Sequence, residues 1–114
     1  MKKTQGLNDG YIEICVEKDN KTDFSAVVTP KSMDDMNTIV ALAYKEQYKR
    51  QQDYEFAEAN DKTLSIKART LIYDEVTTNH KAVIDGTLYN IFKIDQDKAE
   101  RVMYLYLEED RKLG

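Results

Sequence analysis

The residues that most often carry chemistry are few in this sequence and stand apart from one another. His80 is the single histidine and Cys15 the single cysteine. Imidazole is the usual general base and metal ligand near neutral pH, but a structural zinc site needs three or four nitrogen or sulfur donors and this chain offers two. A thiol without a basic neighbour is a poor nucleophile. The sequence therefore predicts no catalytic residue, no metal site and no cofactor.

Acidic residues are abundant, and two of them could act as a general acid and base if the fold brought them together. The local groups are Asp34-Asp35, Asp95 with Asp97, and Glu108-Glu109-Asp110. They fall in expected turns or near the C-terminus, where carboxylates stay solvated. The chain also lacks a complete calcium loop, a glycine-rich phosphate loop and a serine elbow. The sequence thus argues against an enzyme.

One segment mixes basic and aromatic residues in a way that could contact nucleic acid. In "YKEQYKRQQDYEF", cations alternate with tyrosines that could follow phosphates and stack on bases. The alternative is a solvated helix whose tyrosines fold back on the protein, because several acidic residues dilute the positive charge. The candidate contact residues are Tyr44, Lys45, Tyr48, Lys49, Arg50 and Tyr54.

Tyrosines also gather on one face of the expected last strand. Tyr104 and Tyr106 alternate with the apolar series Met103, Leu105 and Leu107, and Tyr89 is expected to join their side. Either a second layer of the domain covers them or they wait for a partner, since tyrosine is enriched in protein interfaces. Tyr89, Tyr104 and Tyr106 are therefore the candidate residues of a self-association interface.

Composition and length indicate one domain over residues 1–114, with flexible ends at about 1–9 and 109–114. The 114 residues are 41% hydrophobic, which is enough for a packed core, and carry a net charge of −4. That charge argues against nonspecific binding to free nucleic acid. The N-terminal residues lack the apolar stretch of a signal peptide, and no run is long enough to cross a bilayer. We expect a soluble protein made in the cytoplasm without contact to a membrane.

The pattern along the chain predicts a mainly β fold. Strands are expected at 11–18, 24–29, 38–44, 62–72 and 101–109, and on both sides of the Asp85-Gly86 turn, which is typical of a two-residue hairpin. Ala82 and Ile84 should share one face before this turn, and Leu88, Phe92 and Ile94 one face after it. A helix is expected between roughly 47 and 59. These elements predict a small antiparallel β-barrel or sandwich of about six strands, with a long loop and short helix inserted after the third strand.

The order of these features resembles the head-tail joining proteins of tailed phages, also called head completion or stopper proteins. The likeness covers roughly residues 10 to 108. It lies in "GYIEICVEKD", "VALAYKEQY", "LSIKAR", the hairpin "AVIDGTLYNIFKID" with its Tyr89, Ile91 and Ile94, and the final "RVMYLYLEE".

This resemblance implies a non-enzymatic virion protein of the phage neck, assembled in the host cytoplasm. Such proteins form rings between the portal-bound adaptor and the tail, extend the double-stranded DNA channel and retain the packaged genome. The long loop after the third strand would place residues 44–61 near the channel. A tail terminator or another neck protein is the alternative within this class. A further alternative, outside this class, is an OB-type module that binds single-stranded nucleic acid.

Overall fold

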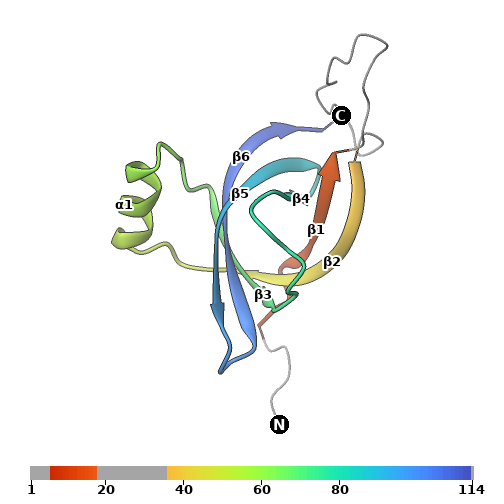
Figure 1. The fold of residues 1–114 in the computed structure, drawn as a ribbon, viewed down its shortest axis with the longest axis horizontal. Helices are drawn as coiled ribbons and strands as arrows, with labels where there is room; N and C mark the ends of the chain where they lie inside the picture. Colours follow the sequence, from red (N-terminus) through yellow and green to blue (C-terminus); the bar gives the residue numbers. More distant parts are fainter. Residues whose placement is uncertain (1–5, 18–35, 114) are drawn as a thin grey trace.

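The computed structural model describes residues 6–17 and 36–113. Within them the chain forms a mainly β fold with one short helix (Figure 1). The elements are β1 (Gly10–Glu17), β2 (Met36–Glu46), α1 (Gln51–Ala59), β3 (Ile66–Leu71), β4 (Lys81–Ile84), β5 (Thr87–Asp97) and β6 (Val102–Lys112). The strand expected at 24–29 lies outside the described residues, so α1 follows the second of the described strands.

The six strands close into a barrel in which every pairing is antiparallel. The order around the barrel is β1-β2-β3-β6-β5-β4, and β4 pairs with β1 to complete the ring. This confirms the predicted small antiparallel barrel. At the C-terminal end, β6 continues to Lys112 and pairs with β5, with Leu88 opposite Arg111. Residues 109–112, expected as a flexible end, are therefore part of the barrel wall.

The barrel interior is filled by the inward halves of alternating strands. Ile12 and Ile14, Ala82 and Ile84, and the series Met103, Leu105 and Leu107 belong to the main buried cluster. Each set has the period-two spacing that puts every second side chain on the same face of a strand. The predicted inward faces of β4 and β6 are confirmed.

The faces predicted for β5 are wrong. Tyr89, Ile91 and Ile94 line the interior, whereas Leu88 and Phe92 pack in two other clusters. The register shifts between Leu88 and Tyr89 and again between Ile91 and Lys93. An extra residue in one strand of a pair changes which face the following side chains occupy, so simple alternation fails across each irregularity.

The Asp85-Gly86 turn joins β4 to β5 as predicted. Ile84 pairs with Thr87, and φ is +49° at Asp85 and +77° at Gly86. Positive φ at both central positions is the requirement of a type I′ turn, whose twist matches that of the flanking strands.

We expect Gly86→Ala to lower the free energy of unfolding by about 1 kcal/mol, the cost of a side chain in left-handed backbone. A Cβ at this position would meet no atom within 4 Å, so the loss would come from backbone conformation alone. Urea unfolding would measure it, with Asp85→Asn as the control, because asparagine tolerates positive φ. An unchanged midpoint for Gly86→Ala would contradict this turn geometry.

Candidate functional site

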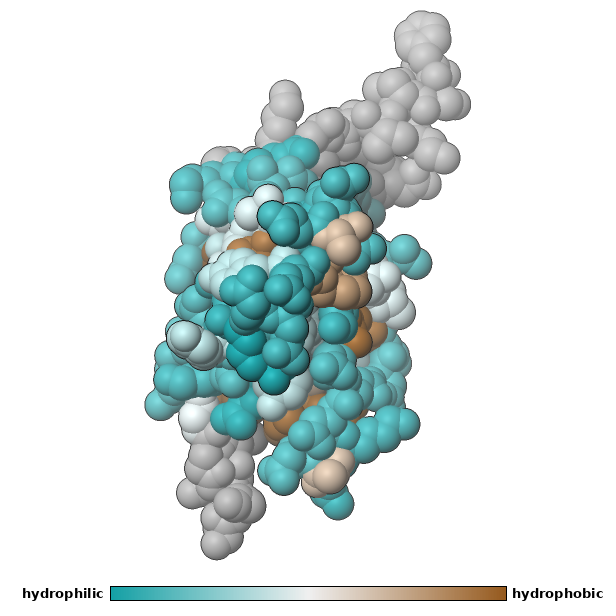
Figure 2. Space-filling model, turned by 90° about the vertical axis from the view of Figure 1, so that its left-hand side faces the viewer, coloured by the Kyte–Doolittle hydropathy of each residue, from teal (hydrophilic) through white to brown (hydrophobic). Residues whose placement is uncertain are grey.

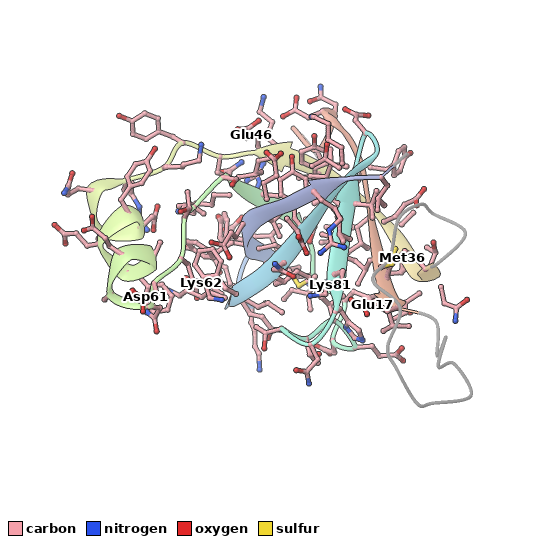
Figure 3. All side chains as sticks on the ribbon, turned by 90° about the horizontal axis from the view of Figure 1, so that it is seen from above. Glu17, Met36, Glu46, Asp61, Lys62 and Lys81 are labelled. Carbon is pink, nitrogen blue, oxygen red and sulfur yellow. The ribbon has the colours of Figure 1, made fainter. Side chains whose placement is uncertain are left out.

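Residues 47–65, here called the arch, leave the barrel after β2 and return to it at β3. The arch carries α1 and stands out to one side of the barrel (Figures 1 and 3). Its two ends are tied to the wall: the Gln47 N–H donates to the Lys67 carbonyl at 2.6 Å, and the Ser65 N–H donates to the Leu107 carbonyl at 2.8 Å. The arch is thus an excursion with fixed ends.

The helix in the arch begins later than predicted because of how its first turn is capped. Arg50 is the N-cap in extended backbone, and its N–H donates to the Asp53 carboxylate at 2.9 Å. An acidic residue at this position satisfies a main-chain donor and favours the positive end of the helix dipole. Residues 47–50, expected as helix, therefore form the lead-in to it.

Asp53 is the centre of a buried polar cluster between the arch and the barrel. Its side chain is 3% exposed. The Lys67 Nζ lies 3.0 Å from Oδ2, the Arg50 Nε 3.6 Å from the same oxygen, and the Tyr106 hydroxyl donates to Oδ1 at 3.4 Å. The Lys67 ammonium also lies 5.3 Å from the centre of the Tyr106 ring. A carboxylate from the arch is therefore paired with a cation from the barrel wall.

The cluster changes the acidity of its members. Burial opposes ionisation of Asp53, but the main-chain hydrogen bond from Arg50 and the hydrogen bond and charge of Lys67 outweigh it, so the pKa of Asp53 lies below its usual value. Burial, followed by the nearby charge of Asp53, raises the pKa of Tyr106 to about 12. At neutral pH Asp53 is ionised and Tyr106 is a neutral donor.

The stability that Asp53 contributes should be lost in acid. Because its pKa is lower in the folded than in the unfolded protein, its contribution is complete above the usual value of 3.8 and declines as pH falls through the lowered folded pKa. We expect the difference in unfolding free energy between the wild type and Asp53→Asn to shrink over this acidic range. Chemical unfolding of both proteins from pH 7 downward would measure it, and a difference independent of pH would contradict the ionised pair.

Aromatic packing supports the underside of the arch. Phe56 stacks on Phe92 with ring centres 6.3 Å apart, and Phe92 meets Tyr106 at the same separation. Ala57 and Leu64 of the arch bury against Tyr106. The arch surface that faces outward is mostly hydrophilic, and apolar residues show beside and beneath it (Figure 2). The arch is thus an outer layer packed on β5 and β6.

The tyrosines predicted to form an interface occupy three different environments. Tyr89 is 8% exposed in the barrel interior, where the irregular register of β5 places it. Tyr106 is 1% exposed because the arch covers it. Tyr104 is half-buried. Tyr89 therefore does not share the face of Tyr104 and Tyr106 as expected, and the arch is the second layer that covers Tyr106. The interface role stays a prediction for Tyr104, the one of the three that is half-buried.

The predicted channel-loop residues also lie in two different parts of the fold, some in β2 and the others in the arch. Tyr44 is 7% exposed in β2 and belongs to the core, and Lys45 lies in the same strand, 4.0 Å from the Asp9 carboxylate. Both precede the arch, because β2 continues to Glu46 by pairing with β3. The prediction that the loop begins at Tyr44 is wrong. Lys49 is half-buried in the arch, and its neighbours Tyr48, Arg50 and Tyr54 are exposed.

Two clefts meet at Tyr48, whose side chain is 87% exposed. One, of about 360 Å³, lies between arch and barrel and is lined by Gln47, Tyr48, Arg50, Lys67, Asp95, Tyr104 and Tyr106. The other, of about 620 Å³, is lined by Glu46, Gln47, Tyr48, Lys49 and Tyr54. Aromatic faces and cations dominate both linings, a chemistry suited to recognition of a partner.

The remaining residues considered from the sequence have local roles. The His80 Nδ1 accepts a hydrogen bond from the Thr77 N–H at 3.0 Å within a turn. Cys15 is fully buried, and burial raises the pKa of its thiol. Glu108 accepts a hydrogen bond from the Thr63 N–H at 2.9 Å and so helps to hold the end of the arch. Asp34 and Asp35 lie outside the described residues.

The sequence interpretation missed the two residues that hold the arch, Asp53 and Lys67. Lys67 lies within the strand expected at 62–72, and Asp53 is one of the acidic residues that dilute the charge of the basic and aromatic segment. A carboxylate three residues after a helix N-cap was the available signal for Asp53. No local signal marked Lys67, whose partner is 14 positions away.

Comparison with known proteins gives no further assignment. No protein-family model matches the chain, and no curated protein matches it. Among the described residues, no helix has both the length and the apolar character needed to cross a membrane.

Proposed function

We propose that the protein is a structural subunit of a tailed-phage neck, a head-tail connector or stopper that forms a ring and extends the DNA channel between the portal-bound adaptor and the tail. The observation that best supports this proposal is the arch: in the described part of the chain, a closed barrel carries an excursion that is anchored by the buried Asp53–Lys67 pair and presents exposed Tyr48. A barrel wall with a projecting element such as the arch suits a subunit that surrounds a passage. The resemblance described above supplies the identity of that passage.

The charge distribution agrees with a channel through which DNA must later slide. Contacts to phosphates add up to tight, salt-dependent binding, so a strongly basic lumen would hold the genome back. The net charge of the chain is −4, and Arg50 and Lys67 are both paired with Asp53. Such a surface permits weak, reversible contact with a duplex and gives no sequence-specific recognition.

Ring assembly would join copies head to tail through two different surfaces of each subunit. Among the described strands, β2 pairs with β3 only at Lys45 and Glu46, so these contacts would use the remaining edge of β2 as well as side chains. Tyr104 is the candidate on the arch side. Exposed Tyr11 on β1 and Leu71 on β3 are candidates elsewhere on the barrel.

The proposed partners are further copies of the chain, the head adaptor and portal proteins on one side and tail proteins on the other. The site of action is the neck of the virion, after assembly in the host cytoplasm. The subunit would act without catalysis and without a cofactor. Its contribution would be to form the wall of the DNA channel.

Electron microscopy would test the proposal. The protein should form annular particles when mixed with the portal–adaptor complex of the same phage, whether or not it does so alone. Arch-side variants such as Tyr48→Ala should preserve the circular dichroism of the barrel. The absence of annular density on the adaptor would contradict the proposal. A pull-down that recovers tail-tube proteins without the adaptor would favour a tail terminator.

A single-stranded nucleic-acid module is the second candidate. The exposure of Tyr48 at 87% and Tyr54 at 48%, on either side of Lys49 and Arg50, favours it, because exposed aromatics can stack on bases. A fluorescence titration with oligonucleotides at low salt separates the two functions. Salt-sensitive binding at micromolar or lower concentration would support the module, and no binding would remove it.

A further inference from the structure

The groups that surround Asp53 form the kind of donor set that proteins use for phosphate. The Arg50 main-chain N–H at the start of α1, the Arg50 guanidinium and the Lys67 ammonium all approach Oδ2, at 2.9, 3.6 and 3.0 Å. The Tyr106 hydroxyl approaches Oδ1 at 3.4 Å. Main-chain donors at a helix start, together with charged nitrogen donors, are a common arrangement for binding oxyanions.

An external anion would have access to the same groups. The lining of the cleft of about 360 Å³ between the arch and the barrel includes Arg50, Lys67 and Tyr106, the three partners of Asp53, beside Gln47, Tyr48, Asp95 and Tyr104. Asp53 itself is buried behind this lining. Its carboxylate therefore fills the position that an oxyanion entering from the cleft would take.

Asp53 supplies one of the two negative charges that face the cations of this cluster. Arg50 comes from the arch, Lys67 from β3, Tyr104 and Tyr106 from β6 and Asp95 from β5. Lys93 of β5 lies over the rings of Phe56 and Tyr106, 4.4 and 4.9 Å from their centres. Without the charge of Asp53, the three cations of this region would face Asp95 alone, and the cleft would become more positive.

We propose that Asp53 is an internal substitute for a phosphate group: it occupies an oxyanion site made by Arg50, Lys67 and Tyr106 and keeps these groups from binding the phosphates of a nucleic acid. The oxyanion site is inferred only from the contacts of Asp53 with Arg50, Lys67 and Tyr106. Its use, to let a duplex slide past the arch, rests on the proposed neck function.

The first test adds inorganic phosphate to a variant that lacks the Asp53 carboxylate. Asp53→Ala should unfold at a lower temperature than the wild type, and inorganic phosphate should raise its midpoint more than chloride does at equal ionic strength. The wild type should not show this preference. Asp61→Asn is the matched control, because it removes the same charge from an exposed position of the arch whose φ of +58° suits asparagine. The double variant Asp53→Ala with Lys67→Met should lose the phosphate effect.

Each result of this phosphate test either supports or overturns the proposed oxyanion site. Equal responses of Asp53→Ala to phosphate and chloride would overturn the proposal. If the alanine variant does not fold in chloride, phosphate should restore its folding. Asp53→Asn, which keeps the side-chain volume, should respond in the same direction as Asp53→Ala. Failure of both variants to fold even with phosphate would also overturn the proposal, because the site would then not accept an external anion.

A second experiment separates nucleic acid from free phosphate as the ligand. By fluorescence anisotropy, Asp53→Ala should bind a DNA duplex about tenfold tighter than the wild type or Asp61→Asn at about 50 mM salt. The slope of the logarithm of the binding constant against the logarithm of salt concentration should become steeper by about one to two, one for each of Arg50 and Lys67 that Asp53 no longer neutralises. Stabilisation by phosphate without tighter duplex binding would overturn the masking role. Both measurements use the isolated protein, so their failure is distinguishable from a failure to form rings.

Discussion

Lys67→Met should lower the free energy of unfolding by about 3 kcal/mol or more. The substitution leaves Asp53 buried without its ammonium partner, and removing one member of a buried ion pair is far more costly than the net value of the pair. Lys67 is 6% exposed, so water cannot readily replace it. Urea or guanidinium unfolding at pH 7 would measure the change.

A double-mutant cycle with Asp53→Asn would show that the loss belongs to the pair. The double variant should be more stable than the sum of the single losses predicts, because the buried charge disappears together with its partner. Lys45→Met is the matched control: its pair with Asp9 spans 4.0 Å, its side chain is 45% exposed, and such pairs contribute about 1 kcal/mol or less. Equal losses for Lys67→Met and Lys45→Met would contradict the buried cluster.

Leu105→Ala should cost about 3 kcal/mol, within the range found when a buried leucine is truncated. Leu105 is fully buried in the main cluster, so the change removes packing and leaves a cavity in the centre of the barrel. Against the roughly 5–15 kcal/mol of an ordinary domain, this is a large fraction of the total stability. Thermal and urea unfolding would both report it.

The neighbouring residue Tyr104 gives the contrast. Its side chain points to the outer face of β6 and is half-buried, so Tyr104→Ala should have a clearly smaller effect on stability than Leu105→Ala. The comparison tests the inward and outward alternation of the last strand directly. A larger loss for Tyr104→Ala would mean that β6 faces the other way.

Sequence patterns were sufficient where the signal is local. The alternation in β4 and β6 identified the inward residues, and Asp85-Gly86 identified the hairpin. In β5 the same rule failed, since the irregularity between Ile91 and Lys93 depends on how β5 aligns with β6. Nothing in the sequence of β5 alone marks that position.

The boundaries of the arch show a second reason why the sequence did not predict the whole fold. Lys45 and Glu46 have the composition of a helix, yet they extend β2 because Arg69 and Ala68 of β3 are there to pair with them. Tertiary pairing overrides local preference in such cases. The structure does place Tyr48, Lys49, Arg50 and Tyr54 in the arch, and their role in a channel stays a prediction.

The polar cluster could not be assembled from the sequence. Asp53, Lys67 and Tyr106 come from three elements, and Asp53 and Tyr106 lie 53 positions apart. Each has an ordinary explanation when considered separately: a helix acid, an outward strand lysine and a strand tyrosine. Only the closed barrel, which brings β3 beside β6 and places the arch over both, makes them one unit.

The central claim, that the protein is a ring subunit whose arch faces the DNA passage, has one most direct test. Electron microscopy of the protein on its portal–adaptor complex would be compared with a variant in which a short linker replaces residues 47–65. The account predicts annular density in both samples and a wider central opening in the variant. Density missing from the outer rim, or no annular particle in either sample, would contradict it.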